Sequence, residues 1–288
     1  MLDEQTWPAM REGVRPVALL PCGATEPHNT HLPYGTDMIM GREVAARVAA
    51  TCAARGVNVV ALPAVPFGVN TTQLDLPFTT NRMPSTQLAL LRDVVRSLAP
   101  HGVRALVLLS AHGGNELRAW VRELQPSTPI VLSIVNWWLA GDHGVFDSAG
   151  DHARELETAA IMHVAPHLVV PDRDTWGDGH AKPSVFDGVR SGWASMPRRR
   201  TQVTADTGVG DPRAATAEKG AILVAQAVER IAAFCVQLAG AAERHIGGSV
   251  GSRGQRRRST VCAAMSPSPK YSECRFSPGI DSSTTMLA

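Results

Sequence analysis

The sequence predicts a single-domain three-layer α/β/α fold with a mostly parallel sheet. Short apolar runs rich in Val, Leu and Ile alternate with longer segments whose apolar residues recur every three or four positions, and polar clusters directly follow three of the runs. Continuous apolar runs are typical of strands that are buried on both faces, and strand and helix alternation is typical of parallel sheets covered by helices. Ligands of such sheets bind beyond the carboxyl ends of the strands, so we expect the functional site there.

The predicted elements follow one another along the chain. The runs VALLP, VNVVALP, ALVLLS and PIVLSIV predict strands at 17–21, 57–63, 105–110 and 129–135. Apolar spacing predicts helices at 37–54, 85–99, 114–124 and 154–165, and an Ala-rich segment predicts a long helix over 214–239.

The composition is that of a folded globular protein. The chain has 288 residues, 44% of them hydrophobic, which is enough for a substantial core. Its net charge of +2 is uneven, because residues 246–288 contribute +4 and leave about −2 for residues 1–245. The main body therefore gives no electrostatic reason to expect nucleic acid as a partner.

The two ends of the chain differ in character. The start, MLDEQTWPAMREG, lacks the features of a signal peptide, and the apolar run IVLSIVNWWLA is too short to span a bilayer, so we expect a cytoplasmic protein without a membrane partner. Residues 246–288 are rich in Gly, Ser, Arg, Thr and Pro without apolar periodicity, which predicts a disordered basic tail after a domain over 1–245. The five cysteines contain no CxxC pair, so neither a disulfide framework nor a zinc ribbon is indicated.

Four ionisable side chains lie close together after the first predicted strand. The segment TEPHNTHLPYGTD contains Glu26, His28, His31 and Asp37. Glu26 and His28 point to one face of an extended segment, and the turn-forming residues before Asp37 can fold it back toward them. Such groups are costly to bury unless a cation holds them, and mixed His and carboxylate ligands suit zinc or manganese. Helix capping and loop hydrogen bonding are the alternative roles.

Two further polar clusters follow later in the chain. SAHGGN puts His112 at a strand end, where Gly113 and Gly114 let the backbone approach a ligand, although an ordinary strand-to-helix turn has the same pattern. GDHARELET places His152 in a loop and Glu157 in the first turns of the next helix, because five residues do not bring two side chains to one helical face. A solvated, charge-rich helix start is the alternative for this cluster.

The ordered combination of these motifs resembles the creatininase family, the creatinine amidohydrolases and their relatives. Family members carry Glu-x-His-x-x-His ending in Thr-Asp, then Asn-Gly-His-Gly-Gly-Asn, then His-Ala-Gly-x-x-Glu-Thr-Ser, and finally Ala-x-x-x-Lys-Gly. This chain has TEPHNTHLPYGTD, SAHGGN, HARELETA and GDPRAATAEKG in that order, over roughly residues 15–240.

The resemblance implies roles for particular residues and a pair of divalent ions, zinc and/or manganese. Four residues match the family's metal ligands: Glu26, His28, Asp37 and His112. By the same resemblance Asp37 bridges the two ions and His152 is the catalytic histidine. The creatinine hydrolases take a further ligand Glu where this chain has Gly114, so we assign Glu157 as the carboxylate recruited instead, and as a candidate catalytic residue.

Several positions depart from the family pattern. Arg154 stands for the usual Gly, Ala159 for Ser, Pro27 for Gln, and Phe78 for the Gly of a Pro-Gly-Thr segment. These residues are expected to shape the pocket, so the substrate can differ from creatinine.

The resemblance implies a metal-dependent amidohydrolase that cleaves a carbon–nitrogen amide bond, with a cyclic amide such as creatinine or a related small molecule as substrate. Hydroxide held by the dinuclear centre would attack, and His152, oriented by Asp151, would protonate the departing nitrogen. Trp137 or Trp138 would pack over the substrate or, more simply, in the core. A deformylase or peptidase of the same family would use the same centre, and the absence of a ligand at Gly114 also fits a catalytically silent metal-binding subunit.

Two expectations complete the sequence-based interpretation. Relatives are commonly hexameric, so the resemblance implies a homo-oligomer. His31 is expected to support the ligands or line the pocket, whereas His180 lacks ligand-like neighbours and is expected in solvent.

Overall fold

The computed structural model describes residues 1–246, with side chains up to residue 241. The tail predicted over 246–288 lies outside the described residues apart from its first position, and its disorder stays a prediction.

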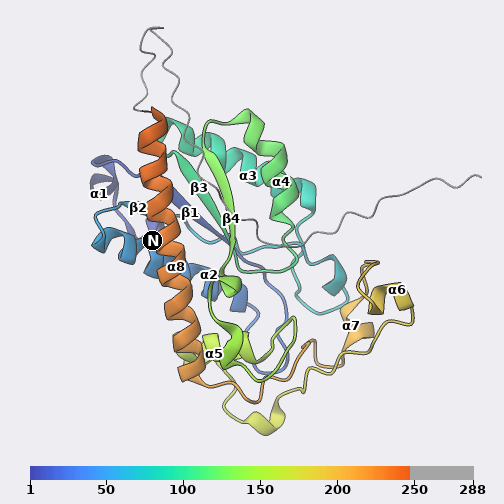
Figure 1. The fold of residues 1–288 in the computed structure, drawn as a ribbon. Coiled ribbons are helices and arrows are strands. Elements are labelled where there is room, and N and C mark those ends of the chain that lie inside the picture. The colour runs from blue at the N-terminus through green and yellow to red at the C-terminus, as the bar shows by residue number, and fades with distance from the viewer. Residues whose placement is uncertain (247–288) are drawn as a thin grey trace, which may run out of the picture. The chain divides into compact units, whose positions relative to one another are not determined.

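A four-stranded parallel sheet forms the centre of the fold. The strands β1 (Val17–Cys22), β2 (Val59–Ala61), β3 (Ala105–Ser110) and β4 (Val131–Asn136) lie in the order β2-β1-β3-β4. Val17 pairs with both Val59 and Ala105, and Ala105 pairs with Val131. All carboxyl ends therefore meet at one edge of the sheet (Figure 1), and the predicted fold class is confirmed.

Helices cover both faces of the sheet, as Figure 1 shows. Val17 and Leu19 of β1 point into a core shared with α2 (Thr36–Ala54), α5 (Glu155–Val164) and α8 (Ala217–Ile246). Their neighbours Ala18 and Leu20 point to the other side, where α3 (Pro84–Leu98) and α4 (Leu117–Leu124) pack. Because alternate residues enter two different cores, the strands read as continuous apolar runs instead of alternating with polar residues.

Short helical segments complete the described fold. They are η1 (Leu2–Glu4), α1 (Trp7–Arg11), η2 (Thr71–Gln73), η3 (Ala99–His101), η4 (Gln125–Ser127), η5 (Trp137–Ala140), η6 (His143–Val145), η7 (Pro166–Leu168), η8 (Arg173–Thr175), α6 (Asp187–Arg190) and α7 (Arg200–Val203).

The long helix α8 belongs to the core. By length and hydropathy its segment Ala217–Ala241 would be able to cross a membrane. Leu223 and Ala227 of this segment are fully buried in the same core cluster as Val44 of α2 and Ile161 of α5, as is usual for a core helix. Gly220 permits the close packing, since a Cβ there would collide with the Ala159 carbonyl of α5.

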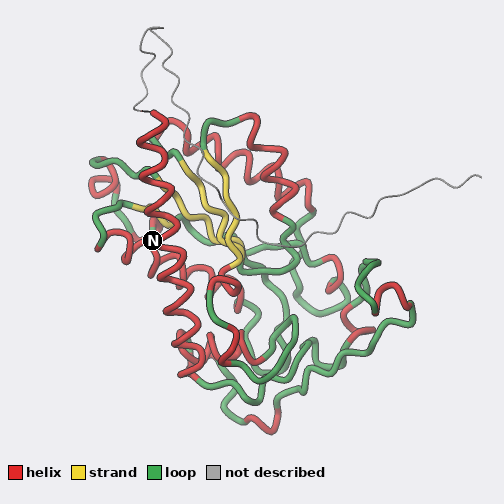
Figure 2. Tube along the Cα trace, in the orientation of Figure 1, coloured by secondary structure: helices red, strands yellow, loops and turns green. Residues whose placement is uncertain are grey.

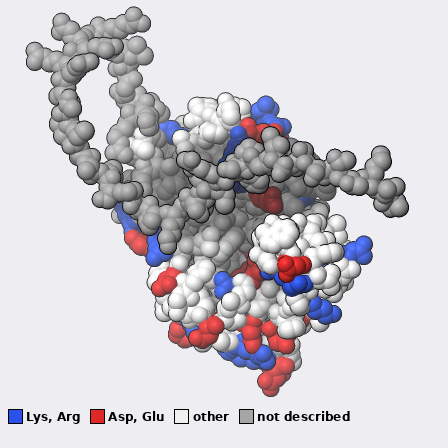
Figure 3. Space-filling model, turned by 45° about the vertical axis from the view of Figure 1, so that its right-hand side comes forward, with Lys and Arg blue, Asp and Glu red and all other residues white. Residues whose placement is uncertain are grey.

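The loops gather beyond the carboxyl edge of the sheet, where Figure 2 shows them in green below the strands. They include the segments after β1, β3 and β4 and the long stretch between α5 and α8, which contains only short helices. On the face drawn in Figure 3, the visible basic and acidic side chains are interspersed over the described part of the chain. The fold therefore directs attention to the loops at the strand ends.

Candidate metal centre

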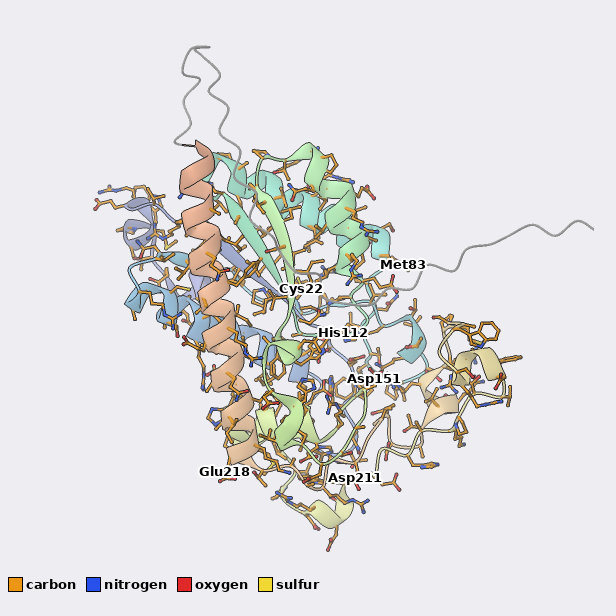
Figure 4. The ribbon with its side chains drawn as sticks, viewed as in Figure 1. Cys22, Met83, His112, Asp151, Asp211 and Glu218 are labelled. Carbon is orange, nitrogen blue, oxygen red and sulfur yellow. The ribbon has the colours of Figure 1, made fainter. Side chains whose placement is uncertain are left out.

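Four ionisable side chains from three parts of the chain converge beyond the strand ends. Glu26 and His28 lie in the loop after β1, Asp37 lies in the first turn of α2, and His112 comes two residues after β3. Figure 4 shows Cys22 at the end of β1 and His112 close below it. All four are buried, with exposed fractions of 0% for Glu26 and His28, 3% for Asp37 and 7% for His112. The sequence-predicted ligands are thus brought together, while their metal role stays a prediction.

The carboxylate of Asp37 faces a different histidine with each oxygen. Its Oδ1 lies 3.0 Å from His28 Nε2, and its Oδ2 lies 3.0 Å from His112 Nδ1. His112 Nδ1 is also 3.0 Å from Glu26 Oε1. Ligand atoms held about 2.1 Å from a tetrahedral zinc ion would lie about 3.4 Å from one another, so these separations are close to those of a ligand cage. Asp37 therefore lies between the two histidines, and each of its oxygens faces a different ring nitrogen.

The donor set fits divalent cations. Ligand atoms of three overlapping trios each lie within 4.8 Å of one another: Glu26, Asp37 and His112; His28, Asp37 and Glu157; Glu26, His28 and His152. Glu26 Oε1 and Asp37 Oδ2 are buried and receive no hydrogen bond of suitable geometry. Buried carboxylate oxygens without partners are costly, and a bound cation removes that cost. Asp37 makes no side-chain cap for α2 either, so the capping alternative fails for this residue.

Opposite charges control protonation inside this cluster. Burial disfavours the charged form of His28, but the adjacent carboxylate of Asp37 outweighs burial and raises the pKa of His28 to about 9. Burial likewise opposes charge on His112, yet Glu26 and Asp37 raise its pKa well above the ordinary value. Burial would raise the pKa of Asp37, but His28 and His112 hold it below its usual range. The carboxylates therefore favour a compensating positive charge in this cluster, which protons on the histidines or bound cations would supply.

His152 lies against this cluster in the loop before α5. Its ring stacks on His28 with centroids 4.3 Å apart, and its Nδ1 lies 3.7 Å from Glu26 Oε1. Burial, together with the nearby His28, lowers the pKa of His152 to about 4. A backbone bridge to Val209 holds this loop in place.

The expected orientation of His152 by Asp151 is wrong. Asp151 is exposed, and the partner of His152 Nε2 is the carbonyl of Pro27 at 2.9 Å. Ala153, the next residue, has a φ of 50°, and in this turn His152 is buried against the cluster while Asp151 lies exposed at the wall of a neighbouring cavity. A carbonyl from the β1 loop therefore takes the orienting role that sequence proximity suggested for Asp151.

Glu157 reaches the site from the first turn of α5. Its Oε2 is buried without a hydrogen-bond partner, and its ligand atom belongs to a trio with His28 and Asp37. Burial raises the pKa of Glu157 to about 7, against the opposing effect of His28. At Gly114 a Cβ would collide with the Val69 carbonyl and with the His112 ring, so a Glu has no room there in this backbone. Glu157 is thus placed where the recruited carboxylate was expected.

Two supporting residues surround the ligands. His31 accepts or donates a hydrogen bond through Nε2 to Thr158 Oγ1 at 2.8 Å and stacks on Trp176, so it packs beside the centre as expected. Gln73 is buried in η2 and donates through Nε2 to Glu26 Oε2. The sequence interpretation missed Gln73, because nothing in the motif around it distinguishes it from a solvated loop amide. His180 is exposed, as expected.

A small cavity of about 100 Å³ opens beside Glu157. It is lined by Ala111, Gly113, Trp137, Trp138, Gly150, Asp151, Arg154, Leu156 and Glu157. Trp137 is only 2% exposed and belongs to the core, and it also contributes to this wall, while packing over a substrate stays a prediction. A larger cavity of about 610 Å³ beside α4 contains none of the candidate ligands. The cavity beside Glu157 is therefore the candidate substrate site.

The fold and the donor set define the class: a three-layer α/β protein with a histidine and carboxylate centre at the carboxyl edge of its sheet. Residues 3–235 match the creatinine amidohydrolase family, and the chain therefore belongs to the creatininase family. Members of this family are hydrolases that act on amide bonds. The resemblance seen in the motifs is confirmed.

Individual relatives agree with this assignment. The chain is 29% identical to the mycofactocin precursor peptide peptidase of Mycobacterium ulcerans (strain Agy99), over 78% of this chain and 83% of that protein. It is 28% identical to the creatinine amidohydrolase of Pseudomonas putida, over 54% of this chain and 67% of that protein. A crystal structure from Bacteroides fragilis NCTC 9343, whose protein is described only provisionally as a creatinine amidohydrolase, is 39% identical with a TM-score of 0.78. The match covers 83% of this chain and 95% of that one.

Proposed function

We propose that this chain is a metal-dependent amidohydrolase whose two divalent cations, zinc and/or manganese, share the carboxylate of Asp37. The observation that carries the proposal is that Asp37 presents its two oxygens to different histidines at 3.0 Å each. Glu26 and His112 would hold one cation, and His28 and Glu157 the other. A creatininase described as the Mn form and a creatininase variant of the Zn-Zn type have the same fold, with TM-scores of 0.66.

The chemistry divides between the cations and the protein. Bound divalent cations supply water activation near neutral pH and polarisation of the amide carbonyl. Because His152 Nε2 faces the Pro27 carbonyl, that nitrogen carries the proton and Nδ1 is left free toward Glu26. Nδ1 can therefore take a proton from the attacking water and pass it to the departing nitrogen.

A peptidase is the second candidate function, with a specific observation in its favour. Four of the curated relatives are mycofactocin precursor peptide peptidases, and the alignment with the one from Mycobacterium ulcerans covers 78% of this chain. The same residues would act in both reactions, and only the pocket would differ. Cytoplasmic location and a homo-oligomeric state are parts of the proposal that rest on the sequence interpretation.

Elemental analysis of the purified protein, paired with hydrolysis assays, tests the proposal. We expect two metal ions per chain and turnover of at least one substrate among creatinine, other cyclic amides, formamides and short peptides, with loss of turnover on chelation and recovery on adding zinc or manganese. Asp37→Ala is expected to lose at least one ion per chain, whereas Asp93→Ala, an exposed carboxylate on α3, keeps both. Bound metal without turnover of any of these compounds would favour the silent-subunit alternative.

A further inference from the structure

Arg154 is a cation in the wall of the substrate cavity with few partners. It is the N-cap residue of α5 and lines the cavity together with Glu157, Trp137 and Trp138. Its guanidinium donates one hydrogen bond among the described residues, from Nη1 to the Ser148 carbonyl at 3.3 Å, and no described carboxylate forms an ion pair with it. A guanidinium has five N–H donors, so most of its hydrogen-bonding capacity is free for a ligand.

The structure holds the stem of Arg154 in a defined place. A Cβ on Gly150 would lie 2.9 Å from Arg154 Cδ, and a Cβ on Gly210 would lie 3.0 Å from Arg154 Cβ. These two glycines therefore leave the space through which the side chain runs. The acceptor Ser148 is fixed as well, because buried Glu155 accepts from the Asp147 and Ser148 amides at 2.8 and 2.7 Å. Lys219 in turn pairs with Glu155 at 2.5 Å.

Arg154 shares the candidate substrate cavity with Glu157, a member of the candidate metal centre. Arg154 is the N-cap residue of α5, three positions before Glu157, and both residues line the same cavity of about 100 Å³. Glu157 belongs to the candidate metal trio with His28 and Asp37. A substrate whose amide reaches the centre through this cavity would therefore bring a neighbouring group of the substrate to the wall that contains Arg154.

We propose that Arg154 binds a carboxylate of the substrate, adjacent to the amide bond that is cleaved. A guanidinium matches a carboxylate with two parallel hydrogen bonds, and a planar carboxylate is small enough for a cavity of about 100 Å³. The substrate class that fits is an N-acyl amino acid or a short peptide with a free terminal carboxylate, in preference to a neutral cyclic amide. This inference rests on the proposed function and names its substrate class.

Matched pairs of compounds test the role of Arg154. N-acetylglycine and N-acetylglycinamide differ only in the carboxylate, as do a dipeptide and its C-terminal amide. Dissociation constants for each pair are measured by titration calorimetry on the metal-loaded protein, and kcat/KM is measured wherever turnover occurs. We expect the wild type to prefer the carboxylate member about 10-fold or more, since a guanidinium donates charge-assisted hydrogen bonds to a carboxylate that a neutral amide does not match.

Three variants complete the experiment. Arg154→Gly should bring the ratio of the two dissociation constants close to one with wild-type metal content, and Arg154→Lys should keep a smaller preference because an ammonium lacks the planar fork. The exposed Arg96→Ala in α3 should keep the full preference. Thermal unfolding of each variant checks its folding.

The outcomes separate the two proposals. A ratio of dissociation constants that is unchanged in Arg154→Gly overturns the role of Arg154, and this result is expected when the carboxylate binds the metal directly. A ratio near one in the wild type overturns it as well. Absence of turnover in the wild type contradicts the proposed hydrolase function, while the ratio of dissociation constants still decides the role of Arg154.

Discussion

The inner ligand cluster (Glu26, His28, Asp37 and His112) and the outer wall of the cavity beside Glu157 differ in where their residues come from and in how deeply they are buried. Glu26, His28 and Asp37 come from one short stretch of sequence and are almost completely buried. The wall instead combines residues from the ends of β3 and β4 with the loop before α5, and Arg154 is only half-buried. The inner cluster has the donor residues that match the family motifs. The wall contains Arg154, which stands where the family motif has Gly. We therefore infer that the chemistry common to the family belongs to the cluster and that the choice of substrate belongs to the wall.

The largest expected effect concerns proton transfer beside the inner cluster. His152→Ala should lower kcat about 10²–10⁴-fold for every substrate, because it removes the group that moves the proton. Metal content should stay at the wild-type value, which elemental analysis measures. Loss of a metal ion in this variant would instead make His152 a ligand, as its trio with Glu26 and His28 allows.

A smaller effect concerns the amide that supports Glu26. Gln73→Leu should weaken metal affinity about 10–100-fold, because Gln73 donates to the Glu26 carboxylate and orients it. Competition with a fluorescent chelator measures this affinity. Gln125→Leu serves as the control, since Gln125 hydrogen-bonds the Ile130 carbonyl and the Leu132 amide far from the ligands. Equal affinities of Gln73→Leu and the wild type would reduce Gln73 to a packing role.

The pH dependence of metal uptake probes the same cluster. The pKa of metal-free His28 is raised from 6.5 to about 9, and a metal must displace the proton that this histidine carries below that pH. Metal affinity should therefore rise between pH 6.5 and 9, by about tenfold per pH unit for each proton released. Calorimetry in buffers of different ionisation enthalpy counts the protons. Uptake without proton release would contradict the charge balance described above.

The smallest expected effect concerns a loop outside the cluster. Phe78 has a φ of 58° and is 90% exposed, so its side chain adds strain and little burial. Phe78→Gly should raise the free energy of unfolding by up to about 1 kcal/mol, as urea denaturation measures, because glycine adopts this conformation readily. Leu74→Gly is the matched control. It should lower stability, since Leu74 is also exposed but has a φ of −65°. A loss of stability in both variants would show that Phe78 contributes contacts that exceed its strain.

Pattern in the chain was enough to predict the elements and the place where the candidate ligands meet. Runs such as ALVLLS predicted β3 within its bounds, because buried parallel strands need apolar residues on both faces. The convergence of the candidate ligands after β1 and β3 was predictable since parallel strands end at one edge, so residues that follow them meet there. His152 and Glu157 were placed correctly as a loop residue and a helix residue for the same reason of local spacing.

Contacts between distant segments decided the rest. Gln73 bonds to Glu26 and the Pro27 carbonyl orients His152, although 47 and 125 positions separate these partners. Asp151 was preferred as the orienting group because it is adjacent in sequence, but the backbone turn at Ala153 directs it away. Arg154 was recognisable as a departure from the family pattern, and only the folded loops show that its charge lines the cavity. By itself, then, the sequence determined the strands, the helices and the chemical types of the ligands, because periodicity and residue chemistry are local. Hydrogen-bond partners and the cavity wall depended on how loops pack in space, which only the tertiary structure decided.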